Sequence, residues 1–163
     1  MTRFSIAALM LTTTLISPAF AGPDGTIDKI EVTVDMTAIT NPAAAARYAH
    51  IGDDLQSALM ARLVDRIAET GMTLSVDISE VELSNTYTEI VGSADTRLVG
   101  TVNITDMENN SNYRSYELSV DINQAKAFLP TTVDLSTLSA SSNEYYKAMI
   151  ATFADTVAQK LSE

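Results

Sequence analysis

The sequence predicts an α+β fold in which an antiparallel-rich, four-stranded sheet carries two helices packed on one face, in the chain order β-α-β-β-β-α. Three observations lead to this fold. Four segments alternate apolar and polar residues, two segments repeat apolar residues every three or four positions, and turn-forming residues separate most of them. Each strand then has one apolar face and each helix one apolar stripe, so a single two-layer packing buries them all.

The first strand is expected over residues 27–36, because Ile30, Val32 and Val34 alternate with polar residues. Asn41-Pro42 then has the composition of a helix start. Residues 53–70 are predicted to be helical, with Gly71 closing the helix as its C-cap. Gly52 interrupts the apolar spacing, which leaves residues 42–50 open to being helix or a separate turn.

Three further strands are predicted to form an antiparallel meander, since turn-forming segments join them. The first covers residues 72–83, where the apolar positions change parity and indicate a bulge near Ser79-Glu80. After a turn at residues 92–95, the other two strands are expected over residues 98–104 and 116–122.

Residues 123–142 lack a sustained period, and we expect a long connection that packs onto the domain through Phe128, Leu129, Leu135 and Leu138. Ser141 and Glu144 match a capping box, which predicts a helix from there to the C-terminus. Its apolar stripe contains Tyr146, Ile150, Phe153, Val157 and Leu161. Tyr145 then points sideways, and with Phe128 it is a candidate for lining a ligand pocket; ordinary packing is the alternative.

The first 21 residues have the order of a secretory signal peptide. Arg3 is followed by an uncharged apolar stretch, Phe4 to Ile16, and then by Ala19-Phe20-Ala21. The apolar stretch is shorter than the roughly 20 residues that span a bilayer. We therefore expect cleavage after Ala21, a single α+β domain over residues 22–163 with no membrane span, and a periplasmic location.

The composition excludes several classes of protein. The chain has no Cys, so it has no disulfide, thiolate zinc site, cysteine nucleophile or lipid-bearing Cys. Ten basic residues against 21 acidic residues give a formal charge of −11, which argues against nucleic acid as a partner. Loss of Arg3 with the leader makes the charge of the mature chain −12. No cofactor motif is present, and we expect no cofactor.

One segment has the spacing of a metal-binding loop. Asp106, Glu108, Asn110 and Glu117 stand at positions one, three, five and twelve, as in an EF-hand calcium loop. However, Ser111 stands where the EF-hand needs Gly, and the flanking segments are predicted strands. A polar hairpin loop is therefore the alternative.

Two further groups of side chains have a spacing compatible with catalysis. His50 lies beside Asp53 and Asp54, a spacing that could orient an imidazole as a base, although no nucleophile motif accompanies it. Glu80 and Glu82 are expected on one strand face, as a glycosidase pair would be, or simply as part of a solvated face.

Two stretches of the chain resemble α+β domains of the Gram-negative cell envelope. They run from Asp54-Leu55 through Leu63 to Gly71-Met72, and over Leu98-Val-Gly-Thr-Val-Asn-Ile-Thr-Asp106. This order of helix, Gly, strand and L-x-G-x-V-x-I-x-D is similar to that in small exported proteins and in lipoprotein domains of envelope maintenance and transport. The resemblance implies an envelope location, but it contains no chemical motif that would assign a functional residue. Many such proteins carry an anchor Cys, which this chain lacks.

These observations favour a non-enzymatic periplasmic binding or assembly module that acts through a sheet edge, the long loop or the acidic surface. Its partner would be an envelope protein or a small ligand. The alternatives are a small-ligand or calcium-binding carrier and, third, a small hydrolase. The sequence does not indicate the oligomeric state.

Overall fold

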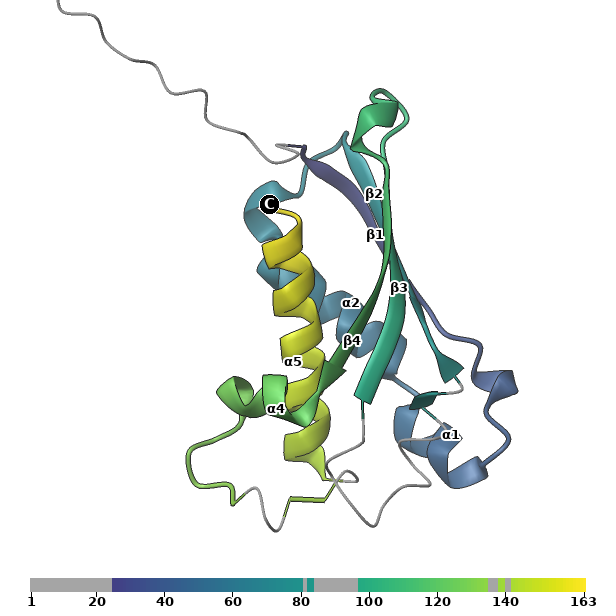
Figure 1. The fold of residues 1–163 in the computed structure, drawn as a ribbon. Coiled ribbons are helices and arrows are strands. Elements are labelled where there is room, and N and C mark those ends of the chain that lie inside the picture. Colours follow the sequence, from purple (N-terminus) through teal and green to yellow (C-terminus); the bar gives the residue numbers. More distant parts are fainter. Residues whose placement is uncertain (1–24, 81, 84–96, 135–137, 140–141) are drawn as a thin grey trace, which may run out of the picture.

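Four strands form one mixed sheet in the order β1-β2-β3-β4 (Figure 1). This computed structural model describes residues 25–80, 82–83, 97–134, 138–139 and 142–163. The strands are β1 (Ile27–Thr33), β2 (Met72–Ile78), β3 (Arg97–Thr105) and β4 (Arg114–Asp121). β1 pairs with β2 in parallel, whereas β2, β3 and β4 form the predicted antiparallel meander. The α+β fold class is therefore confirmed.

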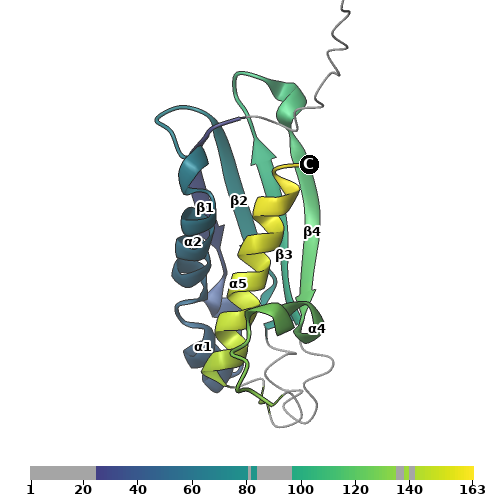
Figure 2. The ribbon, with the colours of Figure 1, turned by 90° about the vertical axis from the view of Figure 1, so that its left-hand side faces the viewer.

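The two long helices, α2 (Ile51–Arg62) and α5 (Asn143–Lys160), lie side by side on one face of the sheet (Figures 1 and 2). Shorter helices, α1 (Pro42–Tyr48) and α4 (Ile122–Ala125), lie near one end of this layer. Single 3₁₀ turns are η1 (Met36–Ala38), η2 (Val64–Arg66), η3 (Asn110–Asn112) and η4 (Lys126–Phe128). The predicted two-layer packing is thus observed.

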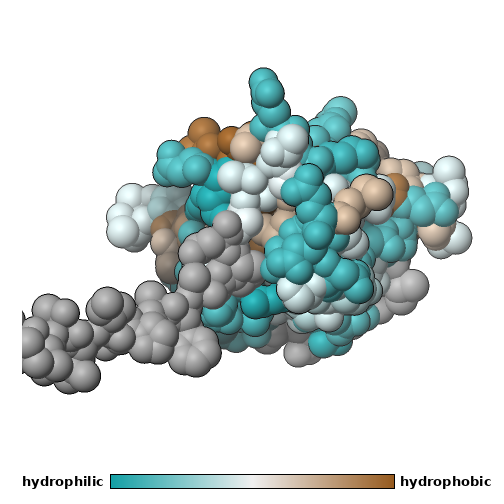
Figure 3. Space-filling model, turned by 90° about the horizontal axis from the view of Figure 1, so that it is seen from above, coloured by the Kyte–Doolittle hydropathy of each residue, from teal (hydrophilic) through white to brown (hydrophobic). Residues whose placement is uncertain are grey.

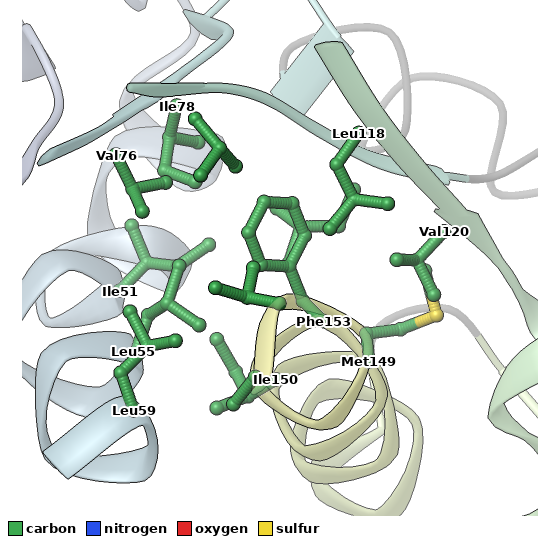
Figure 4. Close-up of a cluster of buried hydrophobic side chains, with 14 of the residues drawn as sticks. Ile51, Leu55, Leu59, Val76, Ile78, Leu118, Val120, Met149, Ile150 and Phe153 are labelled. Atoms are coloured by element: carbon green, nitrogen blue, oxygen red, sulfur yellow. The ribbon is translucent and has the colours of Figure 1, made fainter. Parts of the chain in front are cut away.

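The core lies between the helices and the sheet, with the fully buried ring of Phe153 near its centre (Figure 4). Ile51, Leu55 and Leu59 of α2 face this ring from one side. The sheet contributes Val76, Ile78, Leu118 and Val120. Burial of such side chains contributes about 1.5–3 kcal/mol each relative to exposure, so this cluster is the main stabilising element.

The first half of the chain differs from the prediction at both ends of its helix. The break lies before Ile51 and not at Gly52, and α2 ends at Arg62 instead of residue 70. Residues 64–71 leave the helix because the chain must return to the start of the sheet, where Ile67 bridges to Ile27. Gly71 is consequently not a helix cap. It has a positive φ before β2, and a Cβ there would collide with the carbonyl of Thr26.

The predicted strands at residues 27–36 and 72–83 are both too long. β1 ends at Thr33, and Asp35 caps η1 by accepting a hydrogen bond from the Thr37 N–H. β2 ends at Ile78, and the described residues after Ser79 form a helical turn in which the Leu83 N–H donates to the Ser79 carbonyl. This turn, and not a bulge, causes the change of apolar parity. The turn predicted at residues 92–95 lies outside the described residues.

The connection over residues 123–142 is partly helical, because Asp121 and Gln124 form a capping box that starts α4. Phe128, Leu129 and Leu138 pack against the core as expected, while Leu135 lies outside the described residues. The N-cap of α5 is Ser142, whose side chain accepts a hydrogen bond from Tyr145 N–H. The cap predicted at Ser141 is therefore one residue too early.

Candidate binding groove at the sheet edge

A groove of about 480 Å³ runs along the outer edge of β1, between this strand and α2. β1 is an edge strand of the sheet, and α2 lies over it in Figure 2. The wall of the groove is formed by the whole of β1 and by side chains of α2 and the segment after it: Ile27, Asp28, Lys29, Ile30, Glu31, Val32, Thr33, Gln56, Met60 and Ile67.

The groove combines an open backbone edge with apolar side chains. In the described part of the chain, β1 pairs with β2 on one side, and its other side is bridged only at Ile27, by Ile67. The edge that follows this bridge presents backbone N–H and C=O groups that an added strand could bond. Met60 is 47% exposed and Ile67 is 42% exposed, so apolar surface adjoins these groups.

Charged side chains of β1 lie on the side of the strand that turns away from α2. Lys29 Nζ and Glu31 Oε1 are 2.7 Å apart, and both side chains are about half exposed. Ile30 lies between them in sequence and is buried toward the helices. The edge therefore carries Lys29 and Glu31 on either side of the apolar Ile30, and a second exposed acid, Asp28, precedes Lys29.

A second, much smaller hollow of about 20 Å³ lies at the start of α5, enough space for about one water molecule. Tyr145 and Tyr146 both contribute to its wall, together with Tyr48, Ile51, Leu83, Arg97, Leu98, Met149 and Ile150. The structure reverses the predicted facing of the tyrosines: Tyr145 is 3% exposed in the core, whereas Tyr146 is only half-buried. The helix begins one residue later than predicted.

Tyr146 joins three helices at this end of the molecule. Its hydroxyl donates a hydrogen bond to Asp54 Oδ2 over 2.6 Å, and the Arg47 guanidinium lies 4.8 Å from the centre of its ring. Arg47 also donates to the Ser142 carbonyl and to Asn143 Oδ1, beside the start of α5. Burial, followed by the hydrogen bond to Asp54, raises the pKa of Tyr146. These contacts fasten α1 and α2 to α5.

Phe128, the second candidate for a ligand pocket, is not part of this wall. Its ring lies 5.4 Å from the Arg62 guanidinium, which also pairs with Asp155 at 3.2 Å. Phe128 therefore packs beside the Arg62–Asp155 ion pair that links α2 to α5. The proposed ligand role of Tyr145 and Phe128 stays a prediction.

The structure brings only part of the predicted calcium loop together. Asp106 accepts hydrogen bonds from the N–H groups of Glu108 and Asn109 through one oxygen and from Asn112 Nδ2 through the other. The bond from Asn112 and those two N–H groups lower the pKa of Asp106. Asn110 starts the turn η3, while Glu117 lies farther along β4, opposite Thr101. No cluster of three or more His, Cys, Asp or Glu suited to a metal occurs among the described residues.

The remaining candidates occupy structural positions. His50 is exposed immediately before α2, and Asp54, predicted as its neighbour, bonds to Tyr146 instead. Glu80 accepts a hydrogen bond from the Asp35 N–H over 2.5 Å, and Glu82 accepts one from Arg97 over 3.0 Å. The expectation that Glu80 and Glu82 share a strand face is wrong, because this segment is a helical turn.

Comparison with known proteins assigns the chain to no family. No protein-family model matches the chain, and no curated protein matches it. Among solved structures, the chain is similar to a "putative lipoprotein from Caulobacter crescentus CB15", with 14% identity, a TM-score of 0.40, and coverage of 82% of this chain and 87% of that one.

Within the described residues, no helix has both the length and the apolar character needed to cross a bilayer.

The groove beside β1 was not predicted from the sequence. Its only local signal was the alternation of β1, because the position of a strand at the edge of a sheet depends on the pairing of the whole chain.

Proposed function

We propose that this protein is a non-enzymatic, soluble periplasmic module of the cell envelope that binds or assembles with another polypeptide along the edge of β1. The observation that carries this proposal is the groove beside that edge. An extended segment can add to an edge strand through backbone hydrogen bonds, while its alternate side chains enter a neighbouring groove. Ile30, Val32 and Met60 supply the apolar lining that such side chains would contact.

The periplasmic part of the proposal is supported by the leader sequence. Intact-mass spectrometry of the protein isolated from a periplasmic fraction should give a chain that begins at Gly22. A full-length chain retained in the cytoplasm would contradict this part of the proposal.

The binding part can be tested by photocrosslinking in cells. A photoreactive residue is introduced at Met60 in the groove or, as a matched control, at Met107, which is fully exposed in the β3–β4 connection. Irradiation should give a discrete adduct from position 60 and none from position 107. Failure to form an adduct at position 60, or the same adducts from both positions, would refute binding at this edge.

A further inference from the structure

We propose that the polypeptide bound at this edge is a second copy of the same chain, with the two β1 strands antiparallel about a twofold axis at Ile30. This inference rests on the proposed function and names its partner. It would join two four-stranded sheets into one continuous sheet of eight strands.

The charges on β1 favour this register. In an antiparallel pair centred on Ile30, Lys29 of each copy lies opposite Glu31 of the other. Two unlike pairs then form on the face that turns away from the helices, where both side chains are exposed. Registers centred on Lys29 or Glu31 would instead place two like charges opposite each other, which is destabilising.

The alternation of the strand selects the same register by a second route. Residues directly opposite each other in an antiparallel pair share a face, so Ile30 must meet a residue that also points toward the helices. With the axis at Ile30, the two isoleucines meet, and both helix layers lie on the same side of the joined sheet. An odd shift would place Ile30 against Lys29 or Glu31 and reverse one helix layer.

The exposed apolar side chains near β1 would be covered by this arrangement. Three of the five large apolar side chains that are exposed in the described part of the chain lie on α2 and just after it, namely Met60, Val64 and Ile67. Met60 and Ile67 line the groove itself. Seen from the end that carries the C-terminus, the surface is mainly hydrophilic, with small separate apolar patches (Figure 3). The bridge of Ile67 to Ile27, together with the register shift of β1 between Ile27 and Lys29, limits the regular pairing to Lys29–Glu31.

The register can be tested by exchanging charges on this exposed face. Lys29→Glu places acids at both positions 29 and 31, and Glu31→Lys places bases at both positions. Each variant alone should dimerise at least about tenfold more weakly than the wild type in sedimentation velocity experiments at 0.15 M salt. An equimolar mixture of the two should form heterodimers again, because the acids at positions 29 and 31 of one chain then face the bases at positions 31 and 29 of the other.

Wild-type protein that stays monomeric at about 100 µM would overturn the inference, and so would a dimer whose affinity neither substitution changes. Circular dichroism checks that the variants are folded. The crosslinking at position 60 separates the two proposals. An adduct with twice the mass of the chain supports the second copy, an adduct of another mass refutes it while binding at the edge stands, and the absence of any adduct refutes both.

Discussion

Gly100, in the middle of β3, allows α5 to approach the sheet closely, and we predict that Gly100→Ala destabilises the fold. A Cβ at this position would lie 3.0 Å from the Asp77 carbonyl oxygen, 3.1 Å from Ile78 Cδ1 and 3.2 Å from Phe153 Cζ. Ile78 and Phe153 are fully buried, and so they have little room to move. The added methyl group would therefore overpack the core.

The expected magnitude follows from two opposing effects. Overpacking a filled core costs about 1–3 kcal/mol, whereas replacing Gly by Ala inside a strand recovers about 0.5–1 kcal/mol. The free energy of unfolding should therefore fall by about 1 kcal/mol, which lowers the melting temperature by about 3–5 °C. As a control, Gly52→Ala in α2 should not destabilise, because a Cβ there meets Val32 O at 3.7 Å and Val34 Cγ1 at 3.8 Å.

A double-mutant cycle with Phe153→Leu tests the packing argument itself. The smaller side chain leaves space for the new methyl group, so the double variant should lose less free energy of unfolding than the sum of the single variants, by about 0.5 kcal/mol or more. Urea unfolding followed by far-ultraviolet circular dichroism measures all four proteins. Losses that add to within about 0.3 kcal/mol, or a Gly100→Ala variant as stable as the wild type, would refute the reasoning.

Three further predictions concern the helix ends and the β3–β4 loop. The raised pKa of Tyr146 means that its hydroxyl stays protonated to higher pH in the folded chain than in the unfolded chain, so the free energy of unfolding should fall as pH rises above about 10. Tyr146→Phe should reduce that fall. A variant with the same pH profile of stability as the wild type would contradict this prediction. Ser142→Ala should cost about 1 kcal/mol in urea unfolding by removing the N-cap of α5, while Ser142→Asp should retain most of the stability; equal losses would contradict the capping role. Because Asp106 is bonded within its loop and Glu117 lies along β4, we expect no rise in melting temperature in millimolar calcium; a rise that Asp106→Asn abolishes would show a calcium site.

The strands and helices with a strong local signal were predictable. The alternation in β3 and β4 and the spacing of Ile150, Phe153 and Val157 in α5 identified elements whose buried faces the structure confirms. These patterns were reliable because the apolar spacing within a strand or helix marks which of its own faces is buried. Element ends were less predictable, since residues 64–71 and 79–83 continue an apolar pattern after the chain has turned.

The candidate sites depended on contacts between distant segments, and these were not predictable from local pattern. The sequence identified Tyr145 and Tyr146 as a pair at the start of a helix, but the face that α5 turns to the sheet decided which ring entered the core: Tyr145 is buried on the same face as Phe153. Likewise, the sequence predicts Asp54 as a neighbour of His50, four residues away, whereas its hydrogen-bond partner Tyr146 lies 92 residues away.

By itself, the sequence determined the acidic charge and the absence of cysteine, and it predicted a leader and an α+β order of elements. These are properties of composition and local period, which need no partner elsewhere in the chain. Only the tertiary structure decided that β1 is the edge strand, because strand order results from the pairing of β1 with β2 and of the meander with itself. That edge, with Lys29 and Glu31 on one side and the exposed apolar residues of α2 on the other, is the surface to which we assign binding.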